Sequence, residues 1–140
     1  SRHALFEANE SSGTKILKDE HPDCIQLWSR PAYPPTADVT IRKNKIVGAT
    51  QGIGMFNHIR DGVDDGGFDR ILIEDNDIEV TFPNAIGLLA ARDSTVRNNH
   101  IRTGRGAKYR ASVNLDPAVR HCGNVVAAGA GKPGITESGC

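Results

Sequence analysis

The feature that most constrains the fold of this chain is a short sequence motif, called the phrase below, that recurs along the chain. In each copy an apolar residue is followed three positions later by Asn, and two positions after that by Ile. The copies are Ile41-Arg42-Lys43-Asn44, Ile73-Glu74-Asp75-Asn76 and Val96-Arg97-Asn98-Asn99, followed by Ile46, Ile78 and Ile101. Similarity at a period of roughly 20 to 50 residues indicates stacked supersecondary units. The sequence therefore predicts a repeat fold.

Weaker copies of the phrase extend the repeat in both directions, to residues 14–19 and 119–122. With Asp19 and Cys122 standing at the Asn position, the spacings are 25, 32, 23 and 23 residues. The two longer spacings contain inserts with loop composition: residues 31–36 hold three prolines, and residues 61–67 hold three glycines and three aspartates. Without the inserts the period approaches the two short spacings, which gives about five rungs.

Each copy carries the alternation of apolar and polar residues that is typical of a half-buried strand, as in Val39 and Ile41. A second apolar pattern of strand length precedes the phrase, at residues 24–28, 52–56 and 85–89. These patterns predict a parallel coil of strands, with equivalent residues stacked over one another. The residues expected inside are Ile25, Ile53 and Ile86, and those expected at a bend are Asn44, Asn76 and Asn99. Leucine-rich repeats are the competing solenoid, but their dense leucine pattern is missing.

Length and charge narrow the alternatives. A chain of 140 residues is long enough for one domain, which we place at residues 1–126 with a loop or tail at 127–140. The 17 basic and 17 acidic side chains cancel, so we expect no nucleic-acid partner. No apolar stretch approaches the length of a membrane span, so we expect no membrane partner.

Three cysteines are an odd number and have no C-x-x-C spacing, which argues against a zinc site and against a complete disulfide framework. We expect Cys24 and Cys122 to be small buried apolar residues and Cys140 to belong to a frayed chain end.

The repeated phrase, preceded by Gly52-Ile53-Gly54 or Ala85-Ile86-Gly87, resembles a known family. The family is the right-handed parallel β-helix of polysaccharide lyases, pectin-degrading enzymes and mannuronan C5-epimerases, and the resemblance covers roughly residues 2–126. It implies an all-β, right-handed parallel β-helix (solenoid) of about five rungs. It also implies that the protein acts on a uronic-acid polymer by C5 proton abstraction, as an epimerase or a lyase. The location that it implies is extracytoplasmic, either periplasmic or secreted. The alternative is a non-catalytic carbohydrate-binding or surface solenoid, or a truncated scaffold without activity.

In such a coil, residues that alternate with the interior isoleucines point outward. The first outward column is Gln26, Gly54 and Gly87, and the second is Trp28, Phe56 and Leu89. The glycines predict a shallow groove, and aromatic rings beside it suit the apolar face of a sugar. We therefore expect substrate binding at Gln26, Trp28, Phe56 and Asn57. The alternative is that the two aromatic rings pack beneath the inserts.

Candidate catalytic residues follow the same strands. The stretch Asp19-Glu20-His21-Pro22-Asp23 is similar in composition, though not in order, to the Asp-Pro-His-Asp motif of mannuronan epimerases. The resemblance implies that His21 is base or acid, with Asp23 orienting it. His58 and Arg60 follow the next strand and Arg92 the one after, and a cation is needed to neutralise the uronate carboxylate. Strands in successive rungs are about 4.8 Å apart, so these side chains can converge. The alternative is that His21 and Asp23 only form a turn.

Three aspartates lie close together in the second insert. Asp61, Asp64 and Asp65 offer oxygen ligands that suit calcium, but their spacing is not that of an EF-hand, so we expect no metal and no cofactor, with calcium as the alternative. The acids in residues 74–79 are expected on a solvated face, paired with Arg97, His100 and Arg102 of the next rung. The expected partners are a polysaccharide and a second copy of the chain, joined through exposed ends.

Overall fold

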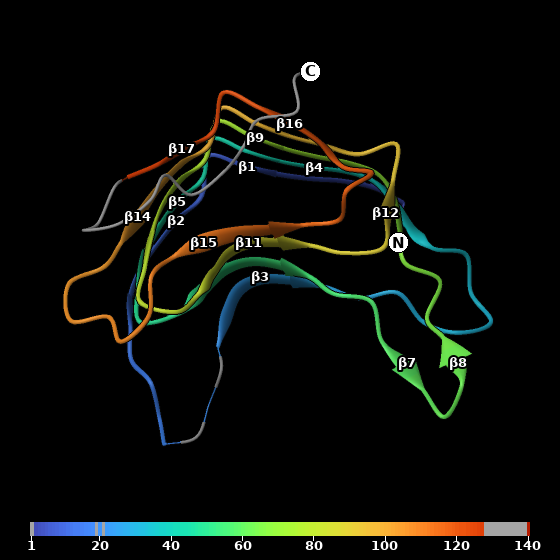
Figure 1. Ribbon diagram of the computed structural model, residues 1–140, viewed down its shortest axis with the longest axis horizontal. Coiled ribbons are helices and arrows are strands. Elements are labelled where there is room, and N and C mark those ends of the chain that lie inside the picture. Colours follow the sequence, from blue (N-terminus) through green and yellow to red (C-terminus); the bar gives the residue numbers. More distant parts are fainter. Residues whose placement is uncertain (1, 19, 21, 128–139) are drawn as a thin grey trace.

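A computed structural model of the chain describes residues 2–18, 20, 22–127 and 140. The described residues form strands and no helix, so the chain is all-β as expected. The strands belong to three parallel sheets through which the chain passes in turn (Figure 1). One passage through the sheets is called a coil below.

The first sheet contains β1 (Arg2–Glu7), β4 (Thr36–Arg42), β9 (Phe68–Glu74), β13 (Thr95–Arg97) and β16 (Arg120–Cys122), with the short β12 (Ala91–Arg92) also paired to β9. The second contains β2 (Glu10–Thr14), β5 (Lys45–Gly48), β10 (Asp77–Val80), β14 (His100–Thr103) and β17 (Val125–Val126). The third contains β3 (Asp23–Leu27), β6 (Gln51–Met55), β11 (Asn84–Leu88) and β15 (Ser112–Leu115). A hairpin of β7 (Ile59–Arg60) and β8 (Val63–Asp64) stands apart.

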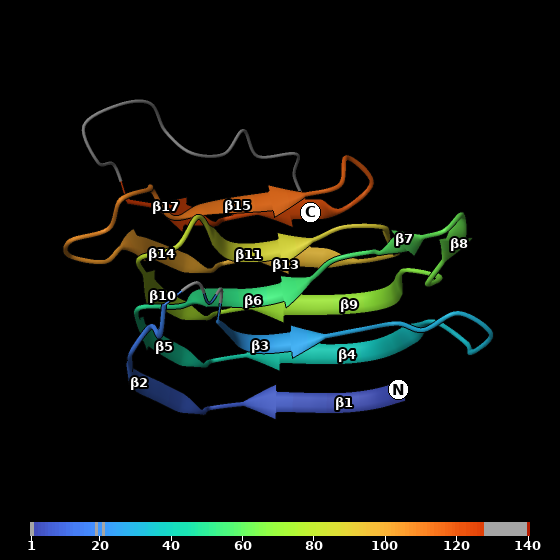
Figure 2. The same cartoon turned by 90° about the horizontal axis from the view of Figure 1, so that it is seen from below.

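Successive coils lie directly over one another, from β1 at one end to β15, β16 and β17 at the other (Figure 2). The order within each sheet follows the order along the chain, and all pairings between coils are parallel. This arrangement is compatible with the expected solenoid. The second insert is not a plain loop, because part of it forms strand β8 of the hairpin.

The core is a set of vertical apolar columns between the sheets. Ile25, Ile53 and Ile86 share one register, and Ile53 and Ile86 are fully buried. A second column joins Ile41 to Ile73, also fully buried. The alternation in the sequence therefore identified the interior correctly. Burial of such side chains is the main stabilising term, at roughly 1.5 to 3 kcal/mol for each large aliphatic residue.

A ladder of asparagine amides runs along the bend between the first and second sheets. The Oδ1 of Asn76 accepts hydrogen bonds from the backbone N and the Nδ2 of Asn44, at 3.0 and 2.9 Å. The Oδ1 of Asn99 accepts the same two bonds from Asn76, at 3.1 and 2.9 Å. Asn44, Asn76 and Asn99 are all buried, so the ladder satisfies polar groups that water cannot reach.

The two ends of the ladder differ from the prediction. Its first member is Asn9, whose N and Nδ2 donate to Asn44 Oδ1, and its last is Asn124, whose Oδ1 accepts from Asn99. Cys122 instead pairs in register with Arg97, two positions before the bend. Asp19 lies outside the described residues. The prediction missed Asn9 because Ser11 stands two positions later, where the other copies have Ile.

Ion pairs between adjacent coils line the outer faces, as expected for the acids in residues 74–79. Glu74 Oε2 accepts from Arg97, with the Nη2 at 2.7 Å, and Glu79 Oε2 accepts from Arg102 Nε at 3.1 Å. Arg102 also reaches Asp77 Oδ1 at 2.9 Å, and these acceptors raise the pKa of its guanidinium. The side chain of Glu74 is mostly covered, so it is not part of a fully solvated face.

The expectation for the cysteines was wrong in one respect. Cys122 of β16 and Cys140 form a disulfide, which joins positions 18 residues apart and fastens the last residue of this chain to the first sheet. Cys24 has a free thiol and is half-buried. The other residues of the expected tail, 128–139, lie outside the described part of the chain. Among the described residues there is no helix with the length and apolarity needed to cross a bilayer.

Candidate functional site

Two segments meet beyond the carboxyl ends of the third-sheet strands. The first, residues 28–35, follows β3, and the second, residues 56–67, follows β6 and contains the β7–β8 hairpin. Parallel neighbours end at the same edge of their sheet, so segments far apart in sequence leave from adjacent points. Both segments project from the body of the coil on the side where β7 and β8 are labelled (Figure 1).

A hollow of about 420 Å³ lies between these segments. On one wall the indole of Trp28 stacks on the imidazole of His58, with ring centroids 4.4 Å apart and planes inclined by 24°. Arg60 and Asp61 contribute to the same hollow. The structure therefore brings together three residues that were expected in the site from separate parts of the sequence, namely Trp28, His58 and Arg60.

Buried hydroxyl groups hold the backbone of Trp28 in place. The Thr36 hydroxyl donates to the Trp28 carbonyl oxygen at 2.8 Å. The Ser29 hydroxyl accepts from the Thr36 backbone N at 3.0 Å and donates to the Gly67 carbonyl oxygen. Both hydroxyl side chains are almost completely buried, so the base of the first segment is anchored to the end of the second. Such anchoring preorganises a site and lowers the entropy lost on binding.

The hairpin is held by its own aspartates. The carboxylate of Asp65 accepts from the backbone N of His58 at 2.7 Å and from that of Gly67 at 3.0 Å. Asp64 accepts from the backbone N of Gly66 at 2.7 Å. Two of the three aspartates that were considered for calcium are thus engaged with the backbone. Among the described residues, no group of three or more His, Cys, Asp or Glu side chains is placed to hold a metal ion.

A second hollow, of about 430 Å³, shares Trp28 and Ser29 with the first. Its other walls come from Arg30, Tyr33 and Pro34 of the first segment. Tyr33 is 71% exposed and Trp28 is 48% exposed, so both rings are accessible to a ligand. Neither Arg30 nor Tyr33 was singled out from the sequence. The Pro-rich insert was the available signal, since inserts in a repeat fold accumulate on functional faces.

The arginines near the site differ in how they are paired. Arg92, a candidate from the sequence, donates from Nε to Asp69 and from Nη2 to the Gly66 carbonyl oxygen at 2.8 Å. Arg92 does not line either hollow. Arg30 and Arg60, by contrast, form no ion pair with any described residue, and both are exposed. The cations available to a ligand at this site are therefore Arg30 and Arg60.

The glycine groove expected on the third sheet is filled. A Cβ placed on Gly87 would lie 2.4 Å from Cζ of Phe56, and one on Gly54 would lie 2.9 Å from Cε2 of the same ring. The ring of Phe56 thus folds back over the glycines instead of standing beside an open groove. Gln26 is exposed on this face, and the Oδ1 of Asn57 is buried with no hydrogen bond from the described residues.

The acidic cluster before β3 is only partly described. Glu20, Pro22 and Asp23 are described, whereas His21 and Asp19 are not. A carboxylate oxygen of Asp23 would lie 2.9 Å from a Cβ on Gly54, which places this carboxylate on the outer face of the third sheet, near Phe56. Asp23 lines neither of the two hollows.

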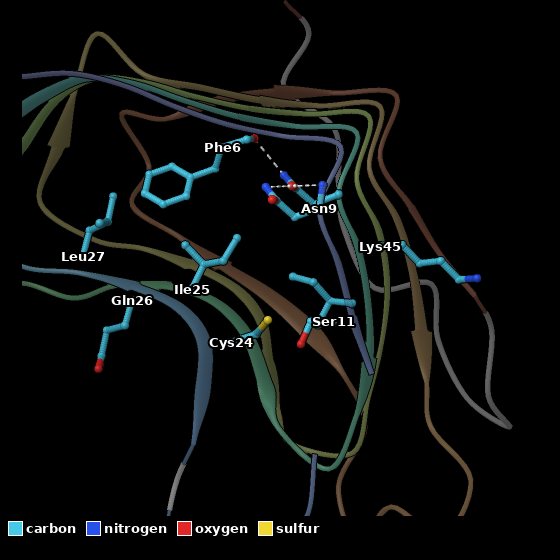
Figure 3. Close-up of a pocket in the computed structure, with 10 residues that line it drawn as sticks. Phe6, Asn9, Ser11, Cys24, Ile25, Gln26, Leu27 and Lys45 are labelled. Carbon is cyan, nitrogen blue, oxygen red and sulfur yellow. Dashed lines mark hydrogen bonds between the residues drawn. The ribbon is translucent and has the colours of Figure 1, made fainter. Parts of the chain in front are cut away.

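A third hollow lies at the open end of the first coil and is different in kind. Its lining includes the core side chains Phe6, Cys24, Ile25 and Leu27, which point into the space between the sheets (Figure 3). Asn9 stands at its rim with the first amide of the ladder. This hollow is the exposed end of the hydrophobic core, and Lys45 is the charged residue among those that line it.

Comparisons of the chain with models of protein families, with curated proteins and with solved structures found no match. The assignment of function therefore depends on the site itself.

Proposed function

We propose that the chain is a right-handed parallel β-helix. The proposal is supported by three parallel sheets visited in strict rotation and by the continuous asparagine ladder at one bend. Connections between parallel strands are right-handed in nearly all known cases, which supports the hand.

We further propose that this protein binds and acts on a uronic-acid polysaccharide at the hollow beside Trp28. The observation that carries the proposal is that Trp28, His58 and Arg60 line one hollow. An aromatic ring suits the apolar face of a sugar, and an unpaired guanidinium suits its carboxylate. An imidazole beside both is the commonest carrier of protons near neutral pH.

The chemistry proposed is removal of the proton at C5 of a uronate. Arg60 neutralises the carboxylate, which stabilises negative charge that develops at C5. His58 takes the C5 proton as the C5–H bond breaks. In an epimerase a proton then returns to the opposite face of C5. In a lyase the C4–O bond breaks instead, a C4–C5 double bond forms, and the leaving oxygen receives a proton from an acid such as Asp61. His21 and Asp23 stay alternative proton carriers.

The test uses alginate and polygalacturonate as substrates. Ultraviolet absorbance detects the unsaturated product of a lyase, and proton NMR detects epimerisation. Turnover that disappears in His58→Gln and Arg60→Gln, while thermal stability is kept, is the expected result. If turnover survives both substitutions and is lost in His21→Ala, the catalytic residues lie in the acidic cluster before β3 and not at the hollow.

A second candidate function is recognition without catalysis. It is favoured by the stacking of His58 on Trp28, since a stacked imidazole widens the aromatic platform that a sugar ring needs. Binding of either polymer by calorimetry, with no change in absorbance or NMR spectrum over a long incubation, would select this candidate. Absence of both binding and turnover would select the truncated scaffold.

An extracytoplasmic location and self-association complete the proposal. The Cys122–Cys140 disulfide supports an oxidising compartment. The apolar hollow at the first coil supports joining of copies through this end, because unpaired strand edges and exposed core side chains favour association. Light scattering at micromolar concentration tests the second point, and a monomer throughout would contradict it.

A further inference from the structure

We infer that the hollow beside Tyr33 is a second sugar site, and that the two hollows together hold two acidic units of one polysaccharide chain across Trp28. This inference rests on the proposed function and deepens it. It assigns to the site a preference for runs of uronic acid over polymers in which acidic units are isolated or esterified.

The two hollows adjoin each other at Trp28 and Ser29. Both are lined by Trp28 and Ser29, so Trp28 is the ridge between them. The hollows are of similar size, about 420 and 430 Å³. A ligand that fills only one of them leaves half of this surface uncovered, whereas a chain molecule can cross the ridge and use both.

Both hollows have exposed aromatic surface. Stacking on His58 covers part of the indole of Trp28, but 48% of the residue stays exposed. The exposed ring of Tyr33 stands in the second hollow. Each hollow therefore offers aromatic surface to a sugar ring, His58 with Trp28 in the first and Tyr33 with Trp28 in the second.

Both hollows also carry positive charge. Each hollow contains one arginine, Arg60 in the first and Arg30 in the second, and neither is paired with a described carboxylate. Several arginines of the sheets are paired instead, for example Arg97 with Glu74 and Arg70 with Asp38. Two unpaired guanidinium groups, one on each side of an aromatic ridge, match a ligand with one carboxylate on each of two sugar units.

Hydrogen bonds hold the ridge at Trp28 in place. The carbonyl oxygen of Trp28 is bonded to Thr36, and Ser29 is bonded to Gly67 at the far end of the hairpin segment. These bonds fix the two walls relative to each other, so the two cations are presented together before any ligand arrives. A ligand with two carboxylates should then bind more tightly than a single uronate. The gain should exceed the statistical factor that comes from the number of sites alone.

The experiment uses the single tryptophan of the chain as a reporter of this site. Quenching or enhancement of its fluorescence measures the binding of galacturonate, of short oligogalacturonates and of their methyl esters. We expect the oligomers to bind. The monomer and the esters should bind at least about tenfold more weakly, because each loses a charged hydrogen bond. Arg30→Gln and Arg60→Gln should each weaken oligomer binding about tenfold. The double variant should no longer distinguish acid from ester.

Matched controls separate the inference from the proposed function. Arg120→Gln changes an exposed arginine of β16 that lines neither hollow, and should leave binding unchanged. If Arg60→Gln weakens binding and Arg30→Gln does not, the second site is rejected while the proposed function stands. If polyglutamate binds as well as the oligogalacturonates, the sugar subsites are rejected in favour of charge alone. If no acidic saccharide binds the unaltered protein, the proposed function itself is rejected.

Discussion

The Trp28 indole stacks on the His58 imidazole with centroids 4.4 Å apart, although the two residues follow different strands of the third sheet. The contact joins the segment after β3 to the hairpin segment after β6. It makes one aromatic wall from two coils, so the site exists only when these coils are stacked in the correct register.

This contact predicts a spectroscopic effect. In His58→Ala the indole loses its stacking partner and becomes more exposed to water, so the emission of the single tryptophan should shift to longer wavelength. His58→Phe keeps a ring in place and should shift it much less. Fluorescence spectra of the two variants test the prediction. Arg60→Gln is the control, because it changes another residue of the same hollow and keeps the stacked pair. Equal spectra for His58→Ala and the unaltered protein would contradict the stacked arrangement.

The asparagine ladder predicts a large stability effect at its centre. Asn76→Ala removes four hydrogen bonds, two from Asn44 and one each to Asn99 Oδ1 and the Ile41 carbonyl oxygen. The partners left behind are buried, so we expect the free energy of unfolding to fall by about 3 to 5 kcal/mol. Denaturant titration followed by circular dichroism measures the change.

Asn9→Ala is the matched control for this substitution. Asn9 is exposed, and its side chain makes one bond to Asn44 Oδ1. Its loss should cost about 1 kcal/mol or less. Similar costs at the two positions would show that the buried ladder contributes no more than a surface hydrogen bond.

Two glycines of the third sheet predict different losses of stability for the same substitution. A Cβ on Gly52 would lie 2.1 Å from the carbonyl oxygen of Ala85, which is backbone of the next coil. Gly52→Ala must therefore separate β6 from β11 and should cost more than about 2 kcal/mol. At Gly87 the obstacle is the ring of Phe56, a side chain that can rotate away. Gly87→Ala should cost less than half as much, as measured by thermal unfolding.

The disulfide predicts a redox-dependent stability. Closing a loop of 18 residues stabilises the folded state by about 3 kcal/mol in the chain-entropy description. Reduction, or Cys122→Ser, should lower Tm accordingly, whereas Cys24→Ser should not change the effect of reductant. Thiol titration under denaturing conditions should find one free thiol per chain before reduction, which corresponds to Cys24. Three free thiols would contradict the pairing.

The ion pair between Asp38 and Arg70 predicts a pH dependence at the acid end. The hydrogen bond from Arg70 lowers the pKa of the Asp38 carboxyl below its ordinary value of 3.8. A lowered pKa means that the pair stabilises the fold above the unfolded-state pKa and loses this contribution as pH falls through the folded-state pKa. NMR titration should give a higher midpoint for Asp38 in Arg70→Gln than in the unaltered protein. High salt should narrow the difference, because the pair is exposed.

The sequence was sufficient for the interior and for the central bends. Alternation placed Ile53, Ile73 and Ile86 inside, and the phrase placed Asn44, Asn76 and Asn99 on one ladder, because both patterns are local and repeat at every coil. The ends of the ladder were missed. Phe6-Glu7-Ala8-Asn9 does match the first four positions of the phrase, but it is followed by Ser11 where the other copies have Ile.

The site was only partly predictable, for a physical reason. Trp28, His58 and Arg60 follow recognisable strands, so their approach could be expected from parallel stacking. The hydroxyl bonds of Ser29 and Thr36 and the carboxylate bonds of Asp65 depend on how irregular segments fold back on one another. No periodicity encodes such contacts. For the same reason the sequence did not reveal that Phe56 covers the glycines or that Arg92 is bonded to Asp69 and Gly66.

The asparagine ladder gives the stack a direction. Every side-chain carbonyl in it faces the preceding coil, and every amide that donates along the ladder faces the following one. The small dipoles of these groups therefore add rather than cancel, as they do along an α-helix. At the first coil the side-chain oxygen of Asn9 accepts no bond from the described residues, so this end of the ladder presents a hydrogen-bond acceptor. A coil stacked in the opposite orientation would place its Asn side-chain oxygen against that of the neighbouring coil. Electrostatic repulsion between the two oxygens would disfavour this stack.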